Sequence, residues 1–207
     1  GKTLIAAASI LDLMETGSID KAVLVAHTKG LQKQHESDLR RCISRRPQDQ
    51  RPSLAVLYGK DNYVCWRLLE RLERRLEEGK PPAAEDQSLL DLCQRVRQVS
   101  AQRPSSHVTR DCLSPPPPDG DWKAISCTQC ANKECLQCDH QTALQMAKGA
   151  DILLINQYVA SMIRETIDGY EGSKECAVLE IPSKEHPYDP EQDAIHRRTK
   201  LLLGIRD

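Results

Sequence analysis

The chain has 207 residues, of which 29% are charged and 3% are aromatic, and its formal net charge at pH 7 is -1. This length allows a sizeable core, whereas the balanced charge excludes a general electrostatic attraction to polyanions such as nucleic acids. No stretch approaches the roughly 20 apolar residues of a membrane-spanning helix, and no export signal is visible, so we expect a cytosolic or nuclear protein.

Helical and strand patterns alternate in the first part of the chain. Residues 2–15 repeat apolar side chains at helical spacing, and the apolar run at 21–27 is typical of a strand buried on both faces of a parallel sheet. Thr28 can cap a further helix over 30–41, and residues 53–58 predict a second strand. This alternation predicts an α/β fold with a parallel sheet.

A mainly helical stretch follows. Residues 66–78 form a charged amphipathic pattern, and apolar residues between 89 and 99 predict another helix. Four consecutive prolines at 115–118 exclude a helix interior or a central strand there. They predict a stiff surface loop or, as the alternative, a proline motif that binds a partner domain.

The sheet pattern resumes after this stretch. Residues 139–148 predict a helix, and residues 151–155 predict a buried strand, so we interpret the helical stretch as an insertion between two sheet strands. The predicted parts are a first sheet segment, an inserted domain, and a return to the sheet with a poorly assigned C-terminal tail: 1–59, 60–149 and 150–207.

The first three residues match the end of a phosphate-binding loop. Gly1, Lys2 and Thr3 would supply a backbone N–H group, a cation for the outer phosphates and a hydroxyl for magnesium at a helix N-terminus. The glycines that precede such a tripeptide are not in the sequence. We therefore expect a piece of a longer protein, and this piece by itself should bind ATP poorly or not at all; a coincidental tripeptide is the alternative.

Four cysteines lie close together in the sequence, with the spacing C-x2-C-x4-C-x2-C, at Cys127, Cys130, Cys135 and Cys138. A fifth, Cys65, lies before the helical stretch. Because cytosolic thiols stay reduced, such clusters favour metal binding over disulfides. The four clustered thiols can complete a tetrahedral zinc site, whereas Cys65 with three of them would suit a four-iron cluster.

Several of these motifs occur in one characteristic order. They are Gly1-Lys2-Thr3, the strand and turn at 23–34, the segment 59–65, and Cys138 followed by 147–156. In this order the chain resembles the iron-sulfur superfamily 2 DNA helicases of the DinG/XPD type, nearer to the bacterial and phage DinG branch. The resemblance implies a partial RecA-like parallel sheet, the first helicase motor domain, with an inserted and mainly helical iron-sulfur cluster domain.

The resemblance also implies roles for individual residues. Cys65 would be the first ligand of a 4Fe-4S cluster, Cys130, Cys135 and Cys138 would be the later ones, and Cys127 is the alternative to one of these. Lys2 and Thr3 would contact ATP and Mg2+ in the intact parent. The residues implied to touch the DNA backbone are Thr28, Lys29 and Gln34.

The sequence departs from this family at two places. Asn156 is followed by Gln157 where the family often has histidine, and no Asp-Glu-Ala-His box follows, since the next apolar run at 177–181 leads into Pro182. No catalytic residue can therefore be assigned, and we expect the fragment alone to be inactive.

These observations predict a fragment of an ATP-dependent DNA helicase that acts in DNA repair. Its partner would be single-stranded or forked DNA, and its location would be cytoplasmic and nucleoid-associated, or nuclear. The alternative is a zinc-stabilised module that binds nucleic acid or protein without motor activity. A degraded gene remnant is the third possibility.

Overall fold

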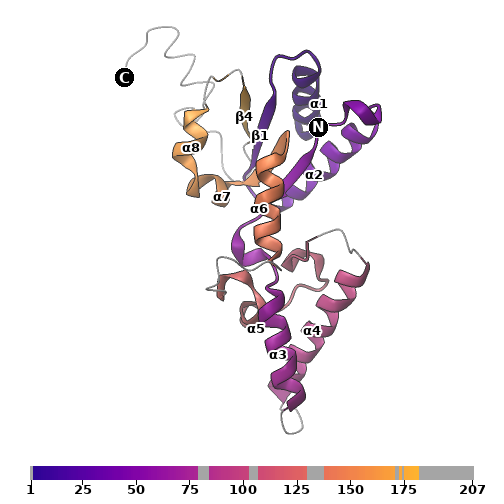
Figure 1. The fold of residues 1–207 in the computed structure, drawn as a ribbon, viewed down its shortest axis with the longest axis vertical. Helices are drawn as coiled ribbons and strands as arrows, with labels where there is room; N and C mark the ends of the chain where they lie inside the picture. The colour runs from indigo at the N-terminus through magenta and orange to yellow at the C-terminus, as the bar shows by residue number, and fades with distance from the viewer. Residues whose placement is uncertain are drawn as a thin grey trace. The chain divides into compact units, whose positions relative to one another are not determined.

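The computed structural model describes residues 2–78, 84–102, 107–129, 138–170, 173 and 175–181. It divides the chain into two compact units, which we call the sheet unit and the helical unit (Figure 1). The sheet unit comprises Gly1–Leu57 with Ala147–Asp207, and the helical unit comprises Tyr58–Met146.

The sheet unit contains a four-stranded parallel sheet in the order β2-β3-β1-β4. Its strands, in chain order, are β1 Lys21–Ala26, β2 Leu54–Leu57, β3 Ile152–Asn156 and β4 Cys176–Ile181. Leu24 of β1 lies opposite Leu154 of β3 on one side and Leu179 of β4 on the other. The prediction of an α/β fold with a parallel sheet is confirmed. Strand β4 was not predicted, although its apolar run at 177–181 is visible in the sequence.

Two helices, α1 Lys2–Glu15 and α2 Lys29–Ser44, lie side by side in this unit (Figure 1). They bury their apolar stripes with strands β1 and β3, because a parallel sheet must be covered to remove its apolar face from water. The Thr28 hydroxyl oxygen accepts a hydrogen bond from the Leu31 N–H at 3.2 Å, which confirms the predicted helix cap. The shared core includes Ile10, Leu11, Leu24, Leu39, Ile152 and Leu154.

Two short helices, α7 Gln157–Met162 and α8 Arg164–Gly169, connect β3 to β4. The Asn156 side-chain oxygen accepts from the Val159 N–H at 2.9 Å and so begins α7. Arg164 forms an ion pair of 2.5 Å with Glu180, which joins the start of α8 to β4. Neither helix was predicted, because six residues are too few to show a clear helical period.

The helical unit is built from α3 Trp66–Glu78, α4 Ala84–Gln102 and α5 Asp119–Ile125, and α6 Asp139–Gly149 begins in it. Helices α3 and α4 lie side by side (Figure 1). The helix predicted at 66–78 is confirmed at those bounds. Side chains from the first three helices form one apolar core, with Leu69, Leu72, Leu92, Val96, Trp122 and Ile125 at its centre.

The proline run at 115–118 lies between two arginines of the helical unit. Arg95 donates to the Pro115 carbonyl, and Arg110 donates to the Pro117 carbonyl at 2.7 Å. Pro118 then occupies the N-cap position of α5. Among the described residues, no helix is both long enough and apolar enough to cross a membrane.

Candidate functional site

The carboxyl ends of parallel strands are the usual place for ligands in α/β sheets. Here β1 leads into Thr28 and β3 ends at Asn156, and both side chains cap the helices that follow. Gly1 lies outside the described residues, and Lys2 and Thr3 begin α1 with side chains that also lie outside them. The phosphate-loop assignment of these three residues stays a prediction.

Helix α2 turns one polar face toward the sheet. The Gln32 side chain is fully buried, and its amide nitrogen donates to the carbonyl oxygens of Leu57 at 3.0 Å and Leu154 at 3.2 Å. It therefore joins the last residue of β2 to the middle of β3. Next to it, His35 is also fully buried, and its two ring nitrogens have no hydrogen-bond partner among the described residues. Burial lowers the pKa of His35, although nearby Asp38 acts in the opposite direction.

Sequence reasoning missed Gln32 and His35. Polar residues in an amphipathic helix are normally assigned to the solvent face. The spacing of these residues could have indicated their burial. Gln32, His35 and the apolar Leu39 lie on one face of α2, and all three are buried.

The residues implied to bind DNA lie at the start of the same helix. The Thr28 oxygen is engaged in the cap, whereas Lys29, the first residue of α2, and Gln34 are exposed. No observation in the structure tests a contact between DNA and these residues.

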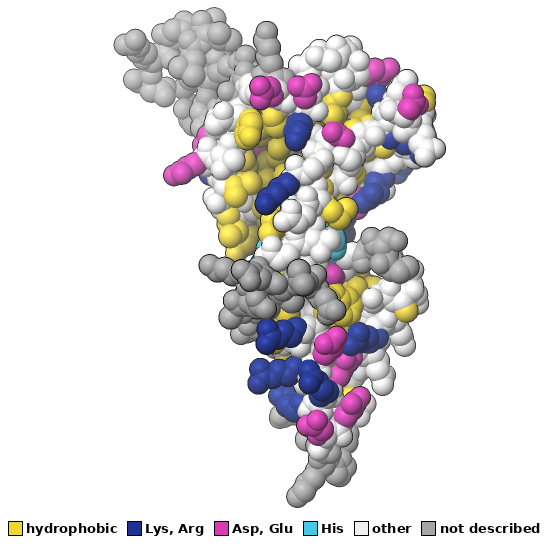
Figure 2. Space-filling view, viewed as in Figure 1, with side chains coloured by type: hydrophobic (Ala, Val, Ile, Leu, Met, Phe, Trp, Pro, Cys, Tyr) yellow, Lys and Arg dark blue, Asp and Glu magenta, His cyan; other side chains and the backbone are white. Residues whose placement is uncertain are grey.

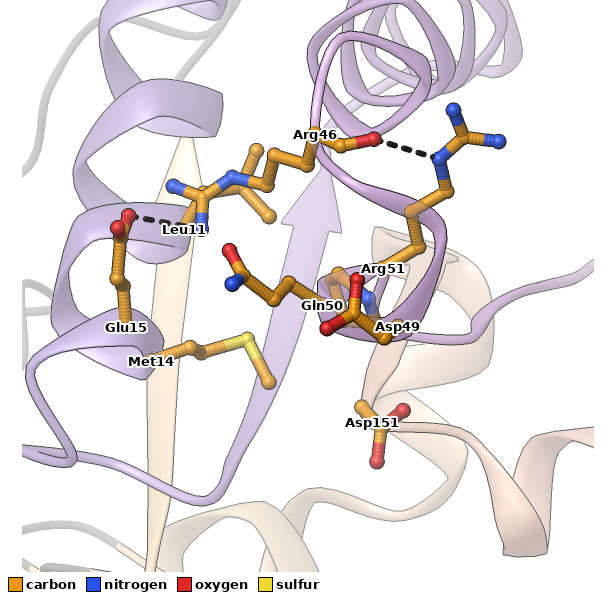
Figure 3. A pocket seen from close by; sticks show the side chains of 9 residues that line it. Leu11, Met14, Glu15, Arg46, Asp49, Gln50, Arg51 and Asp151 are labelled. Atoms are coloured by element: carbon orange, nitrogen blue, oxygen red, sulfur yellow. Dashed lines mark hydrogen bonds and ion pairs between the residues drawn. The ribbon is translucent and has the colours of Figure 1, made fainter.

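A cavity of about 470 Å³ lies at the opposite edge of the sheet unit, near the amino ends of the strands (Figure 3). Leu11 and Met14 line it from α1, and Arg46 spans it to pair with Glu15 at 2.9 Å. Arg51 points away and donates to the carbonyl oxygens of Arg46 and Ser44, both at 2.9 Å. Because Arg51 caps the carboxyl end of α2 and Arg46 ties that end to α1, these arginines stabilise the fold.

Three of the five candidate metal ligands are brought together in the helical unit. Cys65, Cys127 and Cys138 are buried, and the Cys127 and Cys138 sulfur atoms are 3.6 Å apart. The backbone of Cys65 forms an antiparallel bridge with that of Cys138. Cys130 and Cys135 lie outside the described residues.

The three described thiols of this group form hydrogen bonds. A hydrogen bond with the Cys65 side chain, followed by burial, raises the pKa of Cys127 far above its ordinary value. The Cys127 thiol donates to the Val64 carbonyl at 3.2 Å. In the part of the chain that the structure describes, no three His, Cys, Asp or Glu side chains are placed to hold a metal ion.

Large apolar side chains are exposed on and beside α7 and α8. The exposed fraction is 64% for Tyr158 and 70% for Met162, which are one helical turn apart on α7. Ile163 and Tyr170, at the two ends of α8, are 38% and 44% exposed. Hydrophobic side chains also gather on the visible face of the sheet unit (Figure 2). Such a surface is typical of an interaction site.

Comparison with known proteins relates part of the chain to rotary ATPases. The model of the family described as "ATP synthase (F/14-kDa) subunit" matches residues 131–199. The F subunit of the V-type proton ATPase of Rattus norvegicus is 54% identical over 56 residues, which cover 27% of this chain and 46% of the relative. Its counterpart in Saccharomyces cerevisiae is 51% identical over 53 residues, which cover 26% of this chain and 44% of the relative.

A third relative gives the same result. The F subunit of the V-type proton ATPase of Neosartorya fischeri is 47% identical over 64 residues, which cover 31% of this chain and 51% of the relative. The chain thus spans about half the length of the curated relatives it matches. No solved structure matches the chain.

These comparisons correct the predicted function. The assignment to the iron-sulfur DNA helicases, the helicase and ATP hydrolase activity, and a role in DNA repair are wrong, because the matches are to the F subunit of a proton ATPase. The alternative of a zinc-stabilised binding module is wrong for the same reason. The motifs gave a wrong assignment because they are not specific to helicases. A helix after Gly1-Lys2-Thr3 and a strand that ends in Asn156 are compatible with many parallel α/β proteins of different function.

The predicted cofactors, partner and location are corrected as well. A 4Fe-4S cluster or zinc has no support, since the matches are to the F subunit of a proton ATPase and the described residues form no group of three metal-binding side chains, and ATP with Mg2+ was expected only from the helicase resemblance. DNA as partner and a nucleoid or nuclear location have no support, since the relatives are components of a V-type proton ATPase. Gln157 after Asn156 and the missing acidic box were the signals against a helicase.

Proposed function

We propose that residues 131–199 make this chain a component of a V-type proton ATPase, of the same type as the F subunit. In this role it binds other subunits of the pump and carries out no catalysis itself. The observation that carries the proposal is the identity of about half of the aligned residues with the F subunits of a mammal and of two fungi.

The organisation of the matched segment supports an interaction role. Its described part includes β3, α7, α8 and β4, and Val159, Ala160 and Ile167 fix the two short helices to the unit through their buried side chains. Tyr158 and Met162 point to solvent instead. Since burial of large apolar side chains drives association, this exposed face is where we place the contact with another component of the pump.

The proposal places the chain with the proton pump. The ATPase supplies ATP hydrolysis and proton transport, while this chain contributes a binding surface. Its attachment to the membrane-bound assembly then depends on contacts with the other subunits.

Complementation in yeast tests this proposal. The chain would be expressed in Saccharomyces cerevisiae cells that lack their own F subunit, and ATP-driven acidification of isolated vesicles would be measured. We expect partial recovery of proton transport and co-purification of the chain with the ATPase. A chain that is expressed and folded by circular dichroism, but that neither co-purifies nor restores transport, would refute the proposal.

We also infer that the sequence boundaries near 60 and 149 delimit a separate domain. The supporting observation is that the helical unit has an apolar core of its own, centred on Leu69, Leu92 and Trp122. Limited proteolysis of the full chain tests the boundaries. Resistant fragments should end near these positions, and cleavage throughout 60–149 would contradict the inference.

A further inference from the structure

The buried sulfur atoms of the helical unit lie at a reactive distance from one another. The sulfur atoms of Cys127 and Cys138 are 3.6 Å apart, and a disulfide bond is about 2.05 Å long. An approach of roughly 1.5 Å would therefore bring them into bonding distance. Rotation of two side chains and a small backbone adjustment can supply such a movement.

Backbone hydrogen bonds hold these cysteines in place. The Cys127 N–H donates to the Tyr63 carbonyl at 2.9 Å, and the Cys65 N–H donates to the Ile125 carbonyl at 2.7 Å. Cys138 precedes α6, and its carbonyl accepts from the Thr142 N–H at 3.0 Å. The fold of the helical unit therefore sets the distance between the sulfur atoms. Backbone contacts hold the three chain segments that carry Cys65, Cys127 and Cys138 in fixed positions.

We propose that Cys127 and Cys138 are a thiol pair that forms an intramolecular disulfide with a low-molecular-weight disulfide, such as oxidised glutathione, as the oxidant. This site is independent of the proposed ATPase role. A reducing glutathione pool keeps such a pair reduced, so the disulfide forms when that pool becomes oxidised.

The reaction proceeds by two thiol–disulfide exchanges. Cys138 is 5% exposed and Cys127 is fully buried, so Cys138 reacts first. It loses its proton to solvent and attacks one sulfur of the oxidant, which forms a mixed disulfide and releases one glutathione thiolate. Cys127 then attacks the Cys138 sulfur while its proton passes to the departing glutathione sulfur, which releases the second glutathione as a thiol. Two protein thiols are oxidised by two electrons, and one glutathione disulfide is reduced to two thiols.

Cys65 lies beside Cys127 and Cys138 and affects which two of the three sulfur atoms become linked. Its side chain shares a hydrogen bond with Cys127, and its backbone pairs with Cys138. A disulfide between Cys127 and Cys138 can therefore exchange with Cys65. The Cys65→Ser variant removes this exchange and should yield the Cys127–Cys138 linkage as a single product.

The disulfide would connect the start of the short 3-10 helix Cys127–Gln129 to the residue that precedes α6. It closes a short loop over residues 128–137, which reduces the conformational entropy of the unfolded chain. We expect the oxidised protein to unfold at a higher temperature than the reduced protein. The matched segment begins within this loop, at residue 131.

Redox titration of the full chain tests the proposal. The reduced protein would be equilibrated with defined ratios of reduced and oxidised glutathione, alkylated, and analysed by intact mass and peptide mapping. We expect the intact mass of the protein to fall by the mass of two hydrogen atoms, and peptide mapping to show a peptide cross-linked between Cys127 and Cys138. Dithiothreitol should reverse both changes. Cys127→Ser and Cys138→Ser should abolish the cross-link.

Cys93→Ser is the matched control. Cys93 is buried in α4, within the apolar core that includes Leu92 and Val96, so its removal should leave the cross-link unchanged. If a serine variant fails to fold, the rate at which native Cys127 and Cys138 are alkylated before and after oxidation gives the same information. Cross-links to Cys130 or Cys135, mixed disulfides alone, or a metal ion bound by these sulfur atoms would each overturn the proposal.

Discussion

Asp139 accepts a hydrogen bond from the indole nitrogen of Trp66 at 2.9 Å, although 73 residues separate them in the sequence. The other carboxylate oxygen of Asp139 accepts from the Val108 N–H at 2.8 Å. One side chain at the start of α6 thus joins α3 to the segment that follows α4. Since hydrogen bonds to a charged acceptor are stronger than neutral ones, Asp139 is a main polar link within the helical unit.

Replacement of Asp139 should destabilise the helical unit. Asp139→Ala removes both hydrogen bonds and should lower the free energy of unfolding by about 2–4 kcal/mol. Urea titration followed by tryptophan fluorescence measures this, because both tryptophans of the chain, Trp66 and Trp122, belong to this unit. The control is Asp91→Ala, an exposed ion-pair partner of Arg95, with an expected change below about 0.5 kcal/mol. Equal effects of the two variants would contradict the assignment.

Two neighbouring glutamines of α2 should respond very differently to substitution. Gln32→Leu leaves the carbonyl oxygens of Leu57 and Leu154 without their donor, and should lower the free energy of unfolding by about 2–3 kcal/mol. Gln34→Leu changes an exposed side chain on the same helix and should alter stability by less than about 0.5 kcal/mol. Thermal unfolding monitored by circular dichroism compares them, and a small effect at Gln32 would show that water can replace its amide.

Stability should decrease as the solution becomes acidic. Burial lowers the pKa of His35 and of His140 below the ordinary value of 6.5. As the pH falls through that value, the unfolded chain takes up protons that the folded chain excludes, so the free energy of unfolding decreases until the folded-state pKa values are reached. Unfolding measured between about pH 7.5 and pH 5.5 should show this slope.

The pH effect can be assigned to individual histidines. His35→Gln should flatten the slope of stability against pH, even if it changes the stability itself. His140→Gln should remove its own share of the slope in the same way. A wild-type chain whose stability is constant or rises over this range would show that the two buried rings are hydrated.

The exposed face of α7 should matter for assembly and little for folding. Met162→Glu replaces a side chain that is 70% exposed, so the unfolding temperature should change by only a few degrees. Co-purification with the yeast ATPase should fall at least tenfold, because the charge would be buried in the contact. Thr166→Glu, an exposed position on α8, is the control. Equal retention of both variants would place the contact elsewhere.

Much of the fold was predictable, because long regular patterns determine it. The stripe of leucines in α3 and the continuous apolar run of β1 each correspond to one element with nearly the predicted bounds. The short elements were not predictable in this way. Helix α5 has seven residues and α8 has six, and their positions depend on tertiary contacts of Trp122 and Ile167.

The functional assignment failed for a different physical reason. Asn156 was interpreted as part of a motor motif, whereas its side chain caps α7, a role that any helix following a strand requires. Gln32 was not singled out, because sequence does not reveal which polar residue of an amphipathic helix faces the sheet. The resemblance grouped Cys65 with Cys130, Cys135 and Cys138, and gave Cys127 as the alternative to one of these. Separation in sequence alone could not have established that Cys65, Cys127 and Cys138 lie together.

The central position of β1 has a consequence for biosynthesis. Its two hydrogen-bonding edges pair with β3 and β4, which the ribosome makes only after the whole helical unit has been synthesised. The nascent chain must therefore keep this apolar strand from aggregating until the helical unit and both partner strands have been made, which makes β1 a candidate client of chaperones.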